Sequence, residues 1–145
     1  MYGLDDITQL DFGYLTGSDL LIYLPADYLQ VVNDLPGNII QSAVSIAKNK
    51  VMNYLAAIYD LTTEYQNTGE ERNPTVVQLV SFLACNQLAM RDEAMKTNLK
   101  AAWEDFRITI DELKTRRMSL HNVTTISDKP LMEGVVISVL DKYLS

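Results

Sequence analysis

Apolar side chains recur at steps of three and four residues in three long stretches of this chain. The stretches cover residues 38–61, 74–92 and 98–117. This spacing places the apolar residues on one face of a helix, so it predicts three long amphipathic helices. The fold class that follows is mainly α, a small helical bundle.

The boundaries of the first two long helices are marked by capping and breaker residues. Residues 33–38 are rich in such residues, so we expect the first helix to begin near Asn38. Asn73 can cap the second helix with its side-chain oxygen. Pro74 then takes the first helical position, where its missing N–H costs nothing.

The third long helix carries an apolar stripe with alternating steps of four and three residues. Such spacing is typical of a helix face that packs against other helices. We expect the whole stripe to lie in the core of the monomer, and it consists of Leu99, Trp103, Phe106, Ile110 and Leu113.

The N-terminal part has weaker patterns. Residues 1–17 show no clear period and are interpreted as an acidic extension of a helical domain that reaches residue 120. A short helix is predicted near Asp19, capped by Thr16 or Ser18, and a second one opens near Pro25.

The C-terminal part, residues 121–145, changes character and is predicted to be an extension with a possible β-strand. Its apolar, β-favouring residues are Val135, Val136, Ile137, Val139 and Leu140. No partner strand is evident, so one interpretation is an arm that binds another subunit. A hairpin with residues 121–126 and a fourth helix remain equally open.

Composition limits the classes of function. With 145 residues and 48% hydrophobic residues, the chain suits one globular domain. Apolar runs are far shorter than the roughly 20 residues of a membrane span, so no membrane partner is expected. The acidic N-terminus lacks the basic region of a signal peptide, which predicts a cytosolic origin.

The net charge of −7 is unevenly distributed, because residues 1–36 contain six Asp and no Lys or Arg. This segment is interpreted as a solvated acidic face, with a docking arm for a basic partner as the alternative. Scattered basic residues disfavour sequence-specific nucleic-acid binding. The one basic cluster, residues 114–117, suits the dipole at a helix C-terminus.

Few residues suit catalysis or metal binding. The chain has one cysteine, Cys85, and one histidine, His121, which excludes a zinc site. No glycine-rich phosphate loop is present. We therefore expect no enzyme, no metal and no cofactor, with Cys85 as a small helix residue and His121 in a surface loop.

A series of short segments resembles the head-completion or head–tail adaptor (connector) proteins of tailed bacteriophages, especially the small helical Mu-type group. In order, the segments are Tyr14-Leu15-Thr16 with Asp19-Leu20-Leu21, residues 54–60, Arg72-Asn73-Pro74, residues 88–91, residues 103–106 with 110–113, and Met118-Ser119-Leu120. The chain departs from such proteins in having Arg116-Arg117 where they often place a glycine, and in both terminal segments.

The resemblance implies a virion structural protein in the neck between capsid and tail, made in the cytoplasm of a bacterial host. About a dozen copies would form a homo-oligomeric ring beneath the portal, in contact with tail or neck proteins. C-terminal arms would reach into the portal, and double-stranded DNA would pass through the bore without sequence-specific binding. The alternative is a helical binding module for a cellular protein.

Overall fold

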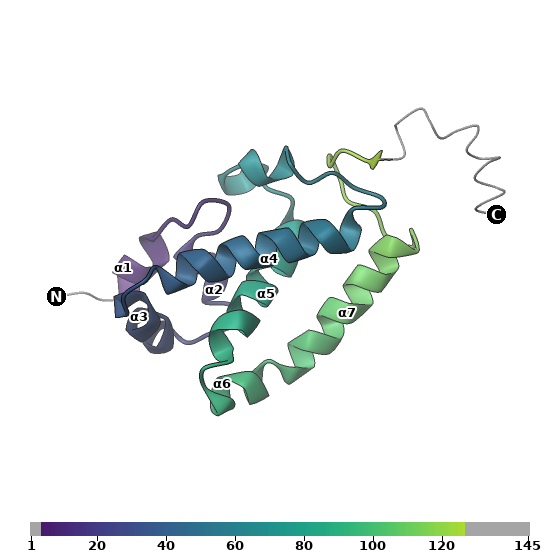
Figure 1. Ribbon diagram of the computed structural model, residues 1–145. Helices are drawn as coiled ribbons and strands as arrows, with labels where there is room; N and C mark the ends of the chain where they lie inside the picture. Colours follow the sequence, from purple (N-terminus) through teal and green to yellow (C-terminus); the bar gives the residue numbers. More distant parts are fainter. Residues whose placement is uncertain (1–3, 127–145) are drawn as a thin grey trace, which may run out of the picture.

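The computed structural model describes residues 4–126, and within that range the chain is mainly helical, as predicted (Figure 1). Two 3₁₀ turns, η1 (Glu64–Gln66) and η2 (Gly69–Glu71), lie between α4 and α5. The α-helices are α1 (Leu4–Gln9), α2 (Gly17–Leu20), α3 (Ala26–Asp34), α4 (Ile39–Leu55), α5 (Pro74–Ala89), α6 (Glu93–Asn98) and α7 (Lys100–Lys114). The residues of the predicted arm lie outside this range.

Helix α5 is the central element of the fold. It packs along α4, while α2 contacts it on one side and α6 and α7 contact it on another (Figure 1). Its buried side chains point in every direction around the axis, and they include Val76, Leu79, Val80, Phe82, Leu83, Ala84, Cys85 and Leu88. A helix that is apolar on all sides is a core helix.

The predicted start of α5 is confirmed in detail. The Oδ1 atom of Asn73 accepts hydrogen bonds from the backbone N–H of Thr75 at 2.9 Å and of Val76 at 3.1 Å. Pro74 occupies the first helical position. Two of the free N–H groups at the helix start are therefore satisfied by a side chain of the preceding residue.

Helix α4 begins after Asn38 as predicted, but it ends at Leu55 rather than near residue 61. The reason is a long-range pairing of the backbone that follows it. Asp60 N–H donates to the carbonyl of Thr124 at 2.9 Å, and Tyr59 forms an isolated antiparallel bridge with Thr125. These groups could not pair in this way inside a helix.

Helix α7 matches the third predicted helix, but the segment before it, which was predicted as a short connection, forms the additional helix α6. Asp92 caps the short helix α6 by accepting hydrogen bonds from the N–H groups of Ala94 and Met95. Asp92 was predicted to lie at the end of the second long helix, but it precedes the start of α6. Helix α7 starts directly afterwards, and Leu99 is the junction between the two.

Helix α7 ends at Lys114, three residues before the predicted end. Arg117 N–H donates to Glu112 O at 2.9 Å and Arg116 N–H to Leu113 O at 3.2 Å, which is the Schellman pattern. Arg116 has φ +64°, the left-handed conformation that this pattern requires and that glycine adopts most easily.

Residues 7–15 contribute to the core, which corrects the interpretation of residues 1–17 as an extension of the domain. Ile7, Phe12, Tyr14 and Leu15 are all buried. A Cβ atom at Gly17 would lie 1.5 Å from the carbonyl oxygen of Ile7, so the backbones of α1 and α2 are in direct contact. Of the two predicted caps, Thr16 is the one that precedes α2, and it forms a capping box with Asp19.

Four residues of the predicted stripe on α7 are buried, but Trp103 is not. Leu99, Phe106, Ile110 and Leu113 lie in the core, whereas Trp103 is 40% exposed. Its ring stacks on the ring of Phe106, with centroids 5.6 Å apart, so Phe106 covers one face of the indole. The prediction of a fully buried Trp103 is therefore wrong.

Candidate interaction surface

The predicted arm, Val135 to Leu140, lies outside the described residues, but the last described residues, 124–126, are bonded to the rest of the domain. Backbone hydrogen bonds join Asp60 N–H to Thr124 O at 2.9 Å and Ile126 N–H to Ile58 O at 2.6 Å. These bonds hold residues 124–126 beside the turn that follows α4. The end of the described chain therefore has a defined place in the domain.

A buried carboxylate connects the N-terminal segment to the start of α5. Glu64 is 4% exposed, and its Oε2 accepts from the hydroxyl of Tyr14 at 2.5 Å and the backbone N–H of Asn73 at 2.6 Å. Its other oxygen accepts from Asn67 Nδ2 at 3.1 Å. A buried charge needs such donors to offset its lost hydration.

Arg72 extends this polar junction to α2. Its guanidinium donates to Asp19 at 2.6 Å and to the carbonyl of Tyr14 at 2.9 Å, and both charged side chains are largely buried. Asp19 also accepts from the backbone N–H of Thr16 at 2.8 Å. One ion pair thus joins the α2 cap to the loop in front of α5.

The hydroxyl of Tyr14 is protonated in this setting. Burial and the hydrogen bond to Glu64 raise its pKa above the ordinary value near 10, and the nearby carboxylate charge adds to the effect, while Arg72 opposes it. A neutral phenol can donate to the carboxylate, so the junction is held by a charge-assisted hydrogen bond.

We expect Tyr14→Phe to lower the free energy of unfolding by about 1.5–3 kcal/mol, the usual range for a hydrogen bond to a charged group. The ring stays in place while the donor is lost. The control is Tyr54→Phe, because Tyr54 is exposed and its change should stay within about 0.5 kcal/mol. Urea unfolding of the three proteins measures both values.

The same variant gives a pH test. As pH rises through the ordinary value near 10, the unfolded chain loses the Tyr14 proton while the folded chain keeps it. The unfolded state then binds fewer protons, so stability falls with rising pH. Tyr14→Phe removes this contribution and should make the decline shallower. An unchanged slope would contradict the protonated state of Tyr14.

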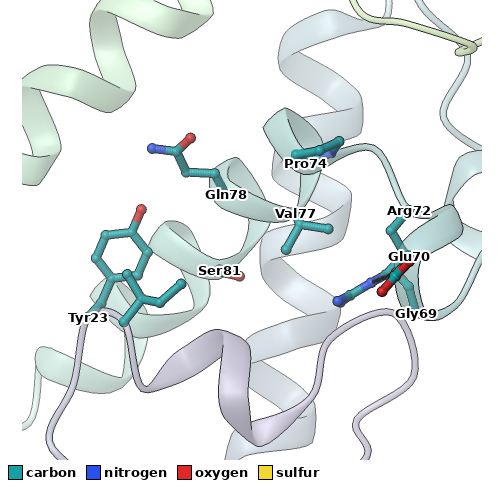
Figure 2. A pocket seen from close by; sticks show the side chains of 9 residues that line it. Tyr23, Gly69, Glu70, Arg72, Pro74, Val77, Gln78 and Ser81 are labelled. Carbon is teal, nitrogen blue, oxygen red and sulfur yellow. Dashed lines mark hydrogen bonds between the residues drawn. The ribbon is translucent and has the colours of Figure 1, made fainter.

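A groove opens beside the polar junction, with a volume of about 730 Å³ (Figure 2). We name it the α5 groove. Figure 2 shows Tyr23 on one side, Arg72 and Glu70 on the other, and α5 between them. Its lining residues are Ile22, Tyr23, Gly69, Glu70, Arg72, Pro74, Val77, Gln78 and Ser81.

The α5 groove combines apolar walls with one unsatisfied polar atom. Ile22 stands at its edge and is 73% exposed, although it is a large apolar side chain. Ser81 is fully buried, and its Oγ has no hydrogen-bond partner in the part of the chain that the structure describes. Ile22 would be covered by a surface or segment that occupies the groove, whereas Ser81 Oγ has no exposed surface and is not reached from the groove.

An aromatic cluster holds α7 against the rest of the domain. Phe82 on α5 lies at its centre, with ring centroids 5.6 Å from Tyr23, 5.7 Å from Trp103 and 5.3 Å from Phe106. Tyr54 on α4 meets Phe106 at 6.1 Å. Tyr54 and Trp103 keep part of their rings in solvent at the two edges of the cluster.

The aspartates of residues 11–36 and the basic residues near the end of α7 are exposed, with one exception. Asp11, Asp27 and Asp34 are exposed, which agrees with a solvated acidic face, whereas Asp19 is paired with Arg72. The basic residues 114, 116 and 117 are exposed at the C-terminal end of α7.

The two residues with reactive side chains lie apart. Cys85 is buried, its Sγ lies 3.5 Å from the carbonyl of Leu20, and burial raises the pKa of its thiol. His121 is exposed, as expected for a loop residue. Among residues 4–126 no group of three or more His, Cys, Asp or Glu is placed to hold a metal ion.

The comparisons with known proteins give no match: no family model, no curated protein and no solved structure is similar to this chain. No helix among the described residues is long and apolar enough to cross a membrane. Functional inference therefore rests on the residues themselves and on the sequence resemblance.

The sequence reasoning missed both the polar junction and the α5 groove. The partners in the junction are separated by fifty residues in the case of Tyr14 and Glu64, so no local pattern could reveal them. One signal was available, because Arg72-Asn73-Pro74 stood out as a break between helices. That Arg72 and Pro74 line a groove could be seen only in the folded structure.

Proposed function

We propose that this chain is a virion structural protein, a head–tail adaptor of a tailed bacteriophage. In this function, copies of the chain form a ring that binds the portal and links the capsid to the tail or neck proteins. DNA passes through the bore of the ring without sequence-specific contacts. The proposal starts from the resemblance, and three features of the fold support it.

The main support is that two distant segments of the resemblance contact each other. Tyr14-Leu15-Thr16 with Asp19 opens the resemblance, and Arg72-Asn73-Pro74 stands in its middle. Arg72 binds both Asp19 and the carbonyl of Tyr14. Segments that build one junction in space have a physical reason to occur together, which generic helical periodicity does not supply.

The second support comes from a position where the chain departs from the resemblance. Such proteins often have a glycine where this chain has Arg116-Arg117. Arg116 adopts the left-handed conformation with φ +64°, which is the conformation that favours glycine. A glycine would be favourable at this position, so the difference from the resemblance is compatible with the proposal.

The third support is the anchored base of the C-terminal segment. After Ile126, nineteen residues follow to Ser145. Fully extended, they would span roughly 60 Å, enough to reach a neighbouring protein. Because residues 124–126 are bonded to the turn after α4, each copy in a ring would present its arm from an equivalent place.

Electron microscopy tests the function. We expect the purified full chain, or the chain mixed with portal, to form rings with a central bore, and a labelled copy to mark a single vertex of phage particles. A chain that stays monomeric or dimeric, is absent from particles and binds a host protein saturably would favour the cellular binding module instead.

The arm supplies a second test. We expect deletion of residues 134–145 to leave helical content and solubility almost unchanged, because residues 4–126 contain the packed core. The same deletion should abolish incorporation into an assembly that contains the portal. Circular dichroism measures the first effect and quantitative blotting of purified particles the second. Normal incorporation of the truncated chain would show that other surfaces make the contact.

A further inference from the structure

The α5 groove lies close to residue 121, shortly before the end of the described residues. Asn73 Nδ2 donates to the carbonyl of His121 at 3.0 Å, and the neighbours of Asn73 in sequence, Arg72 and Pro74, line the groove. From Ile126 to Val135 there are nine residues, which reach up to about 30 Å when extended. The apolar part of the segment can therefore return to the groove of its own chain.

The chemistry of the segment fits the groove. Residues 135–140 are Val, Val, Ile, Ser, Val and Leu, so five of six side chains are apolar. In an extended conformation, Val135, Ile137 and Val139 share one side, which could cover Ile22 and Val77.

The chain's own segment has an advantage over a segment from a second copy. A short flexible connection gives a tethered group an effective concentration in the millimolar range. If the two segments make the same contacts, the segment of another copy at micromolar concentration cannot compete with the chain's own segment. An uncovered apolar run would also be an aggregation hazard in the free protein.

We propose that the α5 groove is an intramolecular docking site for residues 135–140 of the same chain. The free protein holds its C-terminal segment there, where the segment covers Ile22 and Val77. The inference rests on the proposed function in one respect, namely that the portal is the partner for which the segment is released. Groove docking itself is a property of the isolated protein.

A spin label at the C-terminus tests the docking. In the full chain with Ser145→Cys, a thiol-reactive nitroxide should label residue 145 alone, because Cys85 is buried and burial raises the pKa of its thiol. We expect the amide signals of Ile22, Val77 and Ser81 to lose most of their intensity at low micromolar concentration, and to recover it when the label is reduced.

Two matched variants locate the contact. Ile22→Glu places a charge at the groove edge and should abolish the broadening without unfolding, because Ile22 is largely exposed. Val31→Glu changes an equally apolar, exposed residue of α3 that does not line the groove, and should leave the broadening unchanged. Loss of broadening in both variants or in neither would overturn the assignment to the α5 groove.

A mixing experiment separates the chain's own segment from that of a second copy. Spin-labelled chain without isotope is mixed with isotope-labelled chain without spin label. Broadening in the mixture at low micromolar concentration would show exchange between copies and overturn the intramolecular proposal. The proposal would also be overturned if the chain that carries both the spin label and the isotope showed no broadening at the groove. Either failure would leave the ring experiment of the proposed function unaffected.

Discussion

Removal of residues 1–13 should abolish the cooperative unfolding of the domain. This segment contributes Ile7, which is 1% exposed, and Phe12, which is also buried. Emptying two such sites costs about 5–10 kcal/mol if each cost lies within its usual range, against a total stability of about 5–15 kcal/mol for a domain of this size. Urea unfolding followed by circular dichroism measures the loss.

A point variant tests the same contact without shortening the chain. Gly17→Ala would place a Cβ atom 1.5 Å from the carbonyl oxygen of Ile7, so α1 and α2 must separate. Overpacking of this kind costs about 1–3 kcal/mol or more. Ser18→Ala is the control, because Ser18 is exposed on the same helix and its one hydrogen bond across the contact, to Thr8 O, is long at 3.4 Å, so the change in stability should stay below about 0.5 kcal/mol. Equal stability of Gly17→Ala and Ser18→Ala would refute the close approach.

Phe82→Ala should cost about 3–5 kcal/mol, the range for emptying a large buried aromatic site. Phe82 is 2% exposed and contacts the rings of Tyr23, Trp103 and Phe106, so its loss removes the centre of the cluster that holds α7. Near-ultraviolet circular dichroism should lose intensity together with the cooperative transition.

The comparison is Trp103→Ala, for which we expect roughly half that cost, about 1.5–2.5 kcal/mol, because one face of the indole already lies in solvent. Both values come from urea unfolding at low protein concentration. A larger cost for Trp103 than for Phe82 would mean that the exposed face of the indole is covered, and a dependence on protein concentration would assign the cover to a second copy.

Local signals were sufficient where a structural element is decided by its own neighbours. Asn73 and Pro74 form the predicted start of α5, because a cap needs only a side-chain acceptor and the next two or three N–H groups. Periodicity also identified the buried residues Phe106, Ile110 and Leu113 of α7. Short-range chemistry therefore predicted the helical frame.

Predictions from the sequence failed where distant segments decide the outcome. The end of α4 depends on pairing with residues 124–126, and the burial of Glu64 depends on Tyr14 and Asn73. Trp103 fits the spacing of the stripe, yet its position beside a hollow lined by Met90 and Lys100 leaves it partly exposed. Spacing defines a helix face but not how far the neighbouring helix extends over it.

Composition misled in the N-terminal segment. Its aspartates made residues 1–17 resemble a solvated extension, although the buried side chains between them lack a helical period because the segment is divided among α1, a tight turn and α2. The α5 groove could not be predicted for a related reason. Its walls come from three separate parts of the chain, which only the fold brings together.

The way in which residues 120–126 are attached has a mechanical consequence. Leu120 N–H donates to the hydroxyl of Tyr59, His121 O accepts from Asn73, and Ile126 N–H donates to Ile58 O. A pull on the C-terminal end would load these bonds first and pass into the turn after α4 and the start of α5. Helix α7, which lies just before in sequence, would be shielded from the load. Residues 120–126 thus carry tension that is applied to the C-terminal end, so this tension does not act directly on the packing of α7 against the core.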